Sequence, residues 1–558
     1  MLTRPDGFYN QYRKGYRTID YEPNGGMTMA RKTGKAVWTA VATVMLAGTV
    51  LAACGGDSGE TAANGGEAGS KPADTNIRVL LSHNNSGFAS KGPEEKKQKY
   101  YDELSKLSGY NVSFEFLGHD IDFRQQLSLR FASGELTDLV RTGSVDWEVH
   151  QGAVDRGVFL ELGPLIDKYG PNLKKKIPEV AWNSPKVTKN GKIYGIPVLT
   201  GAAADRVIFY RQDMLDQLKM GVPKTLDEFL AFAEAVKKND VNGDGDPNNE
   251  WALSLTDGMS WNDVFTGSFG VRPGTWHMRN GKLEPDIIQP EMKEAIAFYK
   301  KLYDNGYIEK DFITKKQGDR GTDISKGLVA AWGAATYQYA AVAAQQYPNQ
   351  PKAAITMAVP PKGPRGDNFL QIGTDQVYFV WVIPANTKNP EKIIKFLDWA
   401  WSAPEADKFF AYGIKDFNYT EENGQVKFDP KGPNNSELNE KEFFQLSINV
   451  RENGLNNPLA LKVLPNSDVI LKGYEDSKST IMKNDAMYMP PLKAMDGRPE
   501  LNPGFVAGSL FYDWFVKLVV GKEELDKGFD AFVAEWKKRG GEAAIREATD
   551  WYNAFNKK

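Results

Sequence analysis

The sequence predicts an α/β protein whose main body folds into two lobes. Short apolar runs rich in β-branched residues alternate with amphipathic segments, which is the pattern of strands connected by helices. The body that follows a polar N-terminal stretch is about 480 residues long, more than one hydrophobic core usually serves. Hydrophobic residues make up 41% of the chain and charged residues 25%, as in a globular protein.

The first elements of the body are strands and helices in alternation. Residues 77–81 form a short aliphatic run typical of a buried strand, and residues 94–107 have the spacing of a helix. Residues 112–117 predict a second strand, and residues 123–133 a helix that ends at Gly134. A third strand begins at residues 138–140. This order predicts βαβ units with parallel strands.

Later segments carry clear turn and helix-start signals. Asn190-Gly191 is a tight-turn dipeptide that favours a hairpin between Val187 and Ile193. Residues 225–237 predict a helix with Thr225 as its N-cap and Glu228 completing a capping box. Residues 290–305 and 390–402 have similar helix signals.

The N-terminal segment has the organisation of a signal peptide. A basic stretch, 31–35, precedes an uncharged apolar run over residues 36–50, too short to span a membrane as a mature helix. Leu51-Ala52-Ala53-Cys54 then forms a lipobox containing the only cysteine in the chain. It resembles the signals of bacterial lipoproteins, which implies cleavage before Cys54 and a diacylglycerol on its thiol, often with acylation of the new amine. The alternative is a small buried cysteine at the end of a membrane anchor.

The remaining boundaries follow from composition. Residues 1–26 are polar and fit no signal, so we expect translation to start at Met27 or Met29, with residues 1–53 absent from the mature protein. Residues 54–75 lack large apolar side chains after the lipobox and predict a flexible tether, with the body at 76–558. A net charge of −3 suggests neither a nucleic-acid surface nor a polybasic membrane patch. A single cysteine allows no internal disulfide.

Several short motifs occur in the order found in one known family. They are the segments 132–140 (ASGELTDLV), 190–197 (NGKIYGIP), 209–215 (FYRQDML), 223–229 (PKTLDEF), 280–283 (NGKL), 302–306 (LYDNG) and 412–414 (YGI). Together they resemble the extracellular solute-binding proteins of bacterial ABC importers, in particular the large carbohydrate-associated lipoproteins. The resemblance covers nearly all of residues 77–558.

The resemblance implies a periplasmic-binding-protein-like fold with two α/β lobes, a ligand cleft and crossover hinge segments. Lobe I would take mainly residues 76–200 and part of 330–400, and lobe II mainly 205–325 and 400–558. The implied function is capture of a carbohydrate, most simply an oligosaccharide, by closure of the lobes. The implied partners are permease subunits and their ATPase, with a monomeric receptor anchored by lipid on the extracytoplasmic face of the bacterial membrane.

One loop has the spacing of a calcium site. Oxygen-bearing side chains alternate through residues 240–250, and Gly245 stands where such loops turn sharply. We expect a structural calcium ion bound by Asp240, Asn242, Asp244, Asp246 through its backbone carbonyl, Asn248 and Glu250. Position 12 is Trp251, so Glu250 replaces the usual closing glutamate. The alternative is a solvated surface loop.

A saccharide site needs flat aromatic rings for stacking and planar polar groups for hydrogen bonds. Candidates are aromatic and polar residues in loops that follow strands, and we expect at least three of them to contact the ligand. They are Trp147, Glu148, Trp261, Asn262, Trp276, Trp332, Tyr337, Thr374 and Asp375.

Two other functions stay open from the residues alone. The same fold could serve a peptide or another small solute. A lipid-tethered glycan hydrolase is the different-class alternative, because a carboxylate pair cannot be excluded by counting. The four histidines are scattered, and no nucleophile elbow or phosphate-binding loop stands out. The resemblance therefore favours a binding protein without enzymatic activity.

Overall fold

The computed structural model describes residues 74–556 except 85, 120, 200–204, 260, 348–349, 430–431, 436–460 and 463. The chain divides into Met1–Lys71 and Pro72–Lys558, and the described residues all belong to the second unit. The predicted signal peptide, the lipobox with Cys54 and most of the tether lie outside the described residues. Among the residues that are described, no helix is long and apolar enough to cross a membrane.

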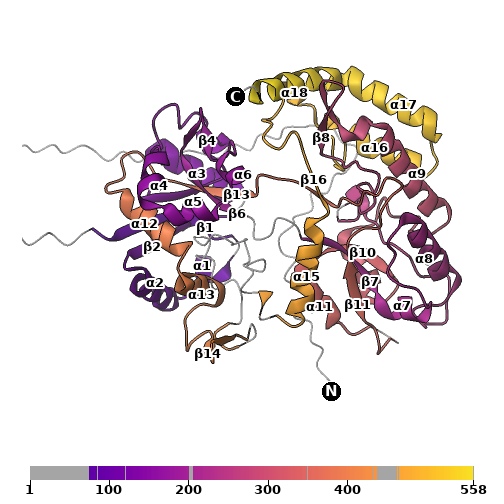
Figure 1. Cartoon of the computed structure of the whole chain (residues 1–558), viewed down its shortest axis with the longest axis horizontal. Helices are drawn as coiled ribbons and strands as arrows, with labels where there is room; N and C mark the ends of the chain where they lie inside the picture. Colours follow the sequence, from indigo (N-terminus) through magenta and orange to yellow (C-terminus); the bar gives the residue numbers. More distant parts are fainter. Residues whose placement is uncertain are drawn as a thin grey trace, which may run out of the picture. The chain divides into compact units, whose positions relative to one another are not determined.

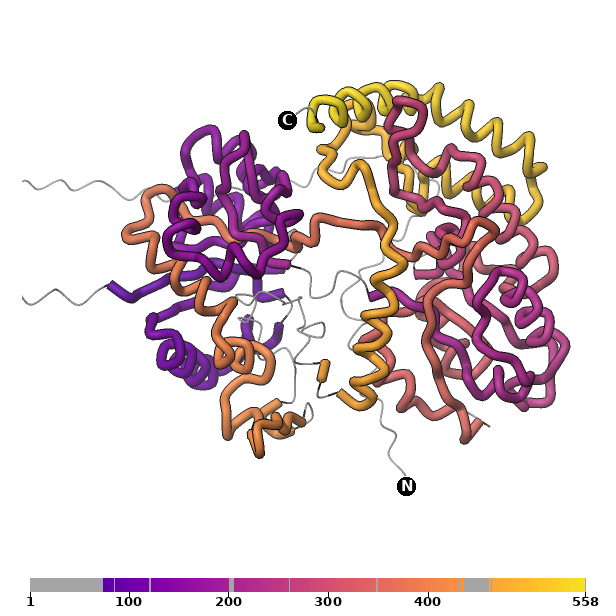
Figure 2. The backbone as a smooth tube through the Cα atoms, in the orientation of Figure 1, coloured from indigo at the N-terminus to yellow at the C-terminus, as the bar shows by residue number. Residues whose placement is uncertain are grey.

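The first lobe is built on a five-stranded mixed sheet with the order β2-β1-β3-β13-β6. β1 (Asn76–Ser82) pairs in parallel with β2 (Asn111–Leu117) and with β3 (Leu139–Thr142). The predicted parallel βαβ order is thus confirmed. β13 (Val377–Val382) lies antiparallel between β3 and β6 (Gly195–Leu199) and brings a distant part of the chain into this sheet (Figure 2).

Helices on this sheet include the two predicted early ones. They are α1 (Gly87–Lys91), α2 (Glu94–Ser108), α3 (Ile121–Ser133), α4 (Gly163–Tyr169), α5 (Pro171–Lys176), α6 (Glu179–Trp182), α12 (Glu391–Ala400) and α13 (Pro404–Tyr412) (Figure 1). The predicted Asn190-Gly191 turn joins β4 (Thr188–Lys189) to β5 (Lys192–Ile193). Both turn residues have positive φ, 52° and 74°, as a two-residue hairpin turn of this kind requires.

The second lobe is centred on a three-stranded antiparallel sheet, β10-β7-β11. Its strands are β7 (Arg206–Arg211), β10 (Ala331–Ala335) and β11 (Ile355–Ala358). Its α-helices include α7 (Gln212–Gln217), α8 (Leu226–Lys238), α9 (Pro290–Asp304), α10 (Gln317–Ser325), α11 (Tyr339–Ala343), α15 (Ser467–Lys478), α16 (Leu510–Val519), α17 (Leu525–Trp536) and α18 (Glu542–Phe555). Short pairs add β8 (Trp276–Arg279) with β9 (Lys282–Pro285), and β12 (Gln371–Ile372) with β16 (Ile481–Met482). Apart from the second lobe, a hairpin of β14 (Thr420–Glu422) and β15 (Gln425–Lys427) follows α13 and packs near its end through a small cluster with Tyr412.

The predicted cap of α8 forms with one change. Thr225 Oγ1 accepts a hydrogen bond from Glu228 N at 3.2 Å, as expected of an N-cap. The Glu228 carboxylate, however, accepts from Lys224 N at 2.7 Å and not from Thr225 N. The reciprocal half of the capping box is therefore made one residue earlier.

Two large hydrophobic cores correspond to the two lobes. The first draws on residues from Ile77 to Leu199 and again from Val377 to Ile414. The second draws on residues from Ile208 to Phe312 and from Ala486 to Ala548. The segment 400–414, assigned from sequence mainly to lobe II, thus contributes to the first core. The reason is that α12 and α13 directly follow β13 and pack on its sheet before the chain leaves it.

Candidate functional site

An exposed tryptophan lies in a strained loop of the second lobe. Trp261 is 38% exposed and has a φ of 65°, and Gly258 and Met259 before it also have positive φ, 64° and 53°. A bulky side chain in this backbone region is rare and costs on the order of 1–3 kcal/mol. Such strain persists only where the surroundings enforce it, and it clusters at ligand clamps and active sites.

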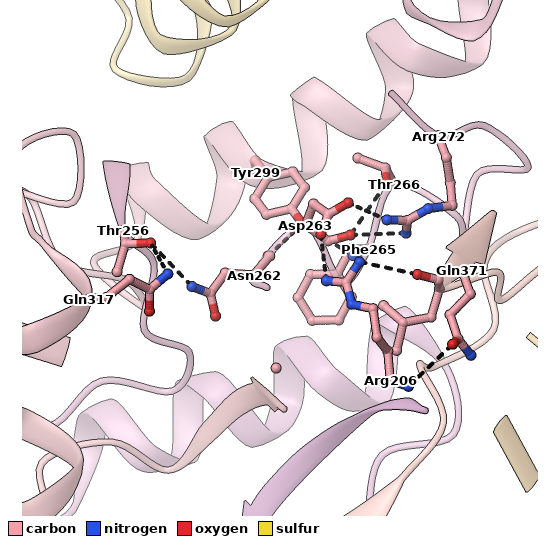
Figure 3. Close-up of polar contacts among 12 residues, drawn as sticks. Arg206, Thr256, Asn262, Asp263, Phe265, Thr266, Arg272, Tyr299, Gln317 and Gln371 are labelled. Carbon is pink, nitrogen blue, oxygen red and sulfur yellow. Dashed lines mark hydrogen bonds and ion pairs between the residues drawn. The ribbon is translucent and has the colours of Figure 1, made fainter. Parts of the chain in front are cut away.

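Polar contacts hold this loop on both sides of Trp261. Tyr512 OH accepts from Gly258 N at 2.7 Å. Asn262 is fully buried, and its side-chain oxygen accepts from Arg320 Nη1 at 2.8 Å. Tyr299 lies beside the loop, and its hydroxyl donates to the backbone carbonyl of Asn262 at 3.3 Å (Figure 3). The position of Trp261 is therefore set by the folded lobe, as preorganised binding requires.

A guanidinium lies against the Trp261 ring. Arg206 Cζ, from the first residue of β7, is 5.2 Å from the ring centroid. Arg206 Nη2 donates to Asp263 Oδ1 at 2.7 Å, and Arg272 donates to the other oxygen of the same carboxylate (Figure 3). Burial alone would raise the pKa of Asp263, but the charges of Arg206 and Arg272 outweigh it and hold that pKa below its usual range.

The first lobe has a hollow of about 400 Å³ at the carboxyl ends of its central strands. It is lined by Ser82, Asn84, His119, Phe123, Arg124, Arg141, Thr142, Gly143, Trp147, Tyr378 and Phe379. In open α/β sheets, the crevice at the carboxyl ends of the strands is where ligands bind. The hollow therefore combines the expected position with aromatic and polar side chains.

Trp147 is held flat against the turn that follows β3. A Cβ on Gly143 would lie 2.8 Å from the Trp147 ring, so glycine permits this close approach. Arg124 Cζ lies 5.5 Å from the Trp147 centroid and its guanidinium also donates to Glu148 at 2.8 Å. Asn84 accepts from Arg141 Nη1 at 2.9 Å, while Asn84 Nδ2 is buried without a hydrogen-bond partner. This amide is a donor suited to a ligand oxygen.

The structure brings the predicted ligand residues together only as two neighbouring pairs, Trp147 with Glu148 and Trp261 with Asn262. It places Trp276 in the core, 3% exposed and packed 6.5 Å from the Trp536 ring. Trp332 is 4% exposed and packs on Phe209.

The other three candidates have structural contacts. Tyr337 is half-buried against a small apolar cluster that includes Leu461 and Tyr474. Thr374 is exposed and its hydroxyl accepts from Gln376 N at 3.2 Å. Asp375 is buried and accepts from Ser184 Oγ at 2.6 Å, so it tethers the crossover segment before β13.

The sequence alone did not place the arginines of the two sites, Arg206 and Arg141. Each lies at a strand end, Arg206 at the start of β7 and Arg141 near the end of β3. The end of β3 was a usable signal, because parallel strands end at the ligand-binding edge. No sequence signal pairs Arg206 with Trp261.

The predicted calcium loop is folded by its own side chains. Asp240 accepts from the backbone of Gly243 at 2.7 Å and of Gly245 at 2.9 Å, both glycines having positive φ. Asn242, Asp244 and Asp246 each accept from the backbone two residues onward. Over the part of the chain that the structure describes, no three His, Cys, Asp or Glu side chains are grouped to hold a metal ion.

Glu250 nevertheless fits a cation. It is 5% exposed, its Oε1 accepts from Asn242 N at 3.3 Å, and its Oε2 is buried without a partner. Burial raises its pKa, and the nearby charges of Asp240 and Asp244 raise it further. A hard divalent ion would satisfy the free oxygen and offset this repulsion, and the oxygen donors of the loop suit calcium.

The sequence of the body matches a known family. Residues 90–407, more than half of the chain, match the family described as bacterial extracellular solute-binding protein. The chain belongs to this family. The solute-binding protein is also 26% identical to the lipoprotein LipO of Bacillus subtilis over 469 residues, which is 81% of this chain and 88% of LipO.

Two further similar proteins have a ligand in their names or titles. The polygalacturonan/rhamnogalacturonan-binding protein YtcQ of Bacillus subtilis is 30% identical over 275 residues, covering 49% of this solute-binding protein and 52% of YtcQ. The solved structure of the substrate-binding protein FusA of Streptococcus pneumoniae in complex with kestose matches with a TM-score of 0.58 and 19% identity. That match covers 86% of this chain and 99% of FusA, and it shows the same two-lobe α/β fold.

Proposed function

We propose that this solute-binding protein captures a carbohydrate for an ABC importer. The observation that carries the proposal is Trp261, an exposed aromatic ring held in a strained backbone conformation by buried polar contacts. A sugar presents apolar C–H faces ringed by hydroxyls, so it needs a fixed aromatic surface beside hydrogen-bonding groups. The hollow with Trp147 and the unpaired Asn84 amide offers the same combination in the first lobe.

Two relatives are named for saccharide ligands, which supports a saccharide here. YtcQ is named for polygalacturonan and rhamnogalacturonan, and FusA is named for fructooligosaccharide. Ligand that contacts both lobes would favour their closed arrangement, and a permease would then distinguish loaded from empty receptor. The partners are permease subunits with an ATPase, and the receptor acts as a monomer without hydrolysing its ligand.

The test is thermal unfolding of the full chain against panels of oligosaccharides and peptides. A ligand that binds only the folded state raises the unfolding midpoint. A shift with a saccharide, and recovery of that saccharide intact, is the expected result. Shifts confined to peptides would replace the carbohydrate proposal, and released sugar would favour the lipid-tethered hydrolase.

We also propose that Cys54 carries the lipid that anchors the protein on the extracytoplasmic face of the membrane. The lipobox at 51–54 supports this, together with the similarity to a lipoprotein of Bacillus subtilis. Two or three acyl chains hold a protein at a bilayer far more firmly than one. Mass spectrometry of the protein recovered from the membrane fraction of a bacterial host should show a chain that begins at an acylated Cys54, whereas an uncleaved chain with a free Cys54 thiol would favour an uncleaved anchor.

A structural calcium ion is the third proposal. Asp240, Asn242, Asp244, Asp246, Asn248 and Glu250 would hold it, with Glu250 Oε2 as the donor that has no other partner. When bound, the ion would supply only positive charge to a loop rich in carboxylates, which orders the loop and stabilises the fold. Calcium should raise the unfolding midpoint without any saccharide present.

A further inference from the structure

The network of ion pairs next to Trp261 contains more positive than negative charge. Two guanidiniums, Arg206 and Arg272, donate to the single carboxylate of Asp263. Asp263 is 9% exposed and Arg272 is 2% exposed, so water screens this charge weakly. One carboxylate balances one guanidinium, which leaves the charge of the other.

Asp286, the acid beside Arg272, does not cancel this excess. Asp286 accepts from the backbone N of Arg272 at 2.9 Å, and it is fully buried. Its carboxylate also accepts from Arg279 Nη1 at 3.0 Å and from His277 Nδ1 at 2.8 Å. Asp286 is thus already matched by Arg279, and the Arg206–Asp263–Arg272 network keeps its positive charge.

The excess charge lies where a stacked ligand would meet it. Arg206 is the member of the network beside Trp261, 5.2 Å from the ring centroid, and its side chain is 19% exposed. The electric field of a charge in a low-dielectric part of a protein is weakly screened at the nearby surface. It therefore raises the local concentration of ligands of opposite charge. The surface around the exposed Trp261 ring therefore favours an anion.

The first lobe shows the same association of tryptophan with guanidinium. Arg124 lies 5.5 Å from the centroid of Trp147, and Arg141 lines the same hollow. The carboxylate of Glu148 balances the charge of Arg124 in an ion pair at 2.8 Å. Arg124 is thus matched by Glu148, and Arg141 donates to Asn84, so the excess positive charge is carried by the network beside Trp261 in the second lobe.

We propose that the ligand is an acidic saccharide, a sugar chain with carboxylate groups such as a uronate oligomer, read by Arg206 beside the Trp261 ring. This inference rests on the proposed function, because it takes Trp261 as a saccharide platform. The ring binds the apolar face of the sugar, and the positive charge of Arg206 selects the carboxylate form over the neutral one.

The test compares each acid with its own uncharged form. Trimers of galacturonate, mannuronate and glucuronate, and their methyl esters, are titrated into the full chain by calorimetry at low and high salt. The ester keeps the shape and removes the charge. We expect at least one acid to bind about 10-fold or more tightly than its ester at low salt, with the ratio falling as salt screens the charge.

The possible results separate this inference from the proposed function. Equal binding of acid and ester, or binding of neutral oligosaccharides alone, would overturn the acidic ligand while leaving a saccharide receptor in place. If no saccharide of either kind binds, the proposed function fails and the inference fails with it.

A set of variants assigns the selection to Arg206. Arg206→Gln should reduce the ratio of the affinity for the acid to the affinity for its ester. Arg206→Lys should retain most of this ratio because the positive charge remains. Arg539→Gln, on an exposed i,i+4 pair with Glu535, is the matched control and should leave the ratio unchanged. A ratio unaffected by Arg206→Gln would show that Arg206 only supports the fold. The ratio is measured only on variants that keep the wild-type circular dichroism spectrum.

Discussion

Gly333 lies directly against the backbone carbonyl of Trp261. A Cβ at Gly333 would be 1.8 Å from the Trp261 oxygen and 2.9 Å from its carbonyl carbon. Gly333 belongs to β10, which is paired with β7, so the strand itself cannot move away without breaking the sheet. The strained tryptophan is therefore positioned by a glycine 72 residues further along the chain.

Replacing this glycine should displace the platform. Gly333→Ala is expected to weaken saccharide binding by about 10-fold or more and to lower the free energy of unfolding by about 1–3 kcal/mol, because the new methyl group overlaps the Trp261 carbonyl. Calorimetric titration and urea unfolding measure the two effects. Gly221→Ala, where no atom lies within 4 Å of the added Cβ, is the control. Unchanged saccharide affinity in Gly333→Ala would mean that the position of Trp261 does not matter for binding.

Glu250→Gln should act in opposite directions with and without calcium. The pKa of Glu250 is raised above its ordinary value of 4.5 in the folded protein. The protonated side chain therefore contributes to the free energy of unfolding below pH 4.5, and this contribution is lost as the pH rises through the raised pKa. At neutral pH in chelator, the variant removes a buried charge and should unfold at a higher temperature than the wild type. In calcium, the variant should gain less than the wild type.

The control for this experiment is Glu475→Gln, an exposed carboxylate in a surface pair with Lys478. It should change neither the midpoint in chelator nor the gain from calcium. A wild-type midpoint that calcium does not raise would remove the proposed ion.

His150 should make the first lobe sensitive to acid. Burial lowers its pKa to about 4, with Phe131 and Phe159 packed around the ring. A depressed pKa contributes stability that is complete above the ordinary value of 6.5 and is lost as pH falls through about 4. The wild type should lose up to about 3 kcal/mol from this residue over that range.

His150→Phe tests this through a difference. The variant loses the hydrogen bond between Thr142 and His150, so it should be less stable than the wild type at neutral pH. Its stability should nevertheless fall less than that of the wild type between neutral pH and pH 4 in urea unfolding. Equal losses in the two proteins would mean that His150 does not titrate as its burial requires.

The Thr225 cap should be measurable in the second lobe. Thr225→Ala leaves Glu228 N without its acceptor and should cost about 1 kcal/mol. Thr225→Ser keeps the hydroxyl and should retain most of that stability. Urea unfolding of the two variants decides the point, and equal losses would assign the effect to packing of the threonine methyl group.

The sequence predicted what depends on neighbouring residues. The N-cap at Thr225, the turn at Asn190-Gly191 and the early strands rest on local propensity, and all are found. The aromatic candidates were harder, because a tryptophan in a loop can face solvent or the core. Trp276 packs against Trp536, 260 residues away, and no local signal distinguishes it from the exposed Trp261.

The Arg206–Asp263–Arg272 network shows the same limit. Its members come from a strand and two positions in one long loop region, and only the folded lobe brings them to a shared carboxylate. The positive φ of Trp261 likewise depends on contacts with Tyr512, Tyr299 and Gly333, which are distant in the chain.

The proposed function depends most on Trp261 as the surface on which a saccharide binds. The most direct measurement is calorimetric titration of the saccharide that most raises the unfolding midpoint into wild type, Trp261→Ala and Phe555→Ala. Phe555 is 39% exposed, close to the 38% of Trp261, so it controls for loss of an exposed ring. We expect Trp261→Ala to weaken binding by about 100-fold and Phe555→Ala to bind as the wild type does, since stacking aromatics dominate such sites. Equal affinity in all three proteins would contradict it.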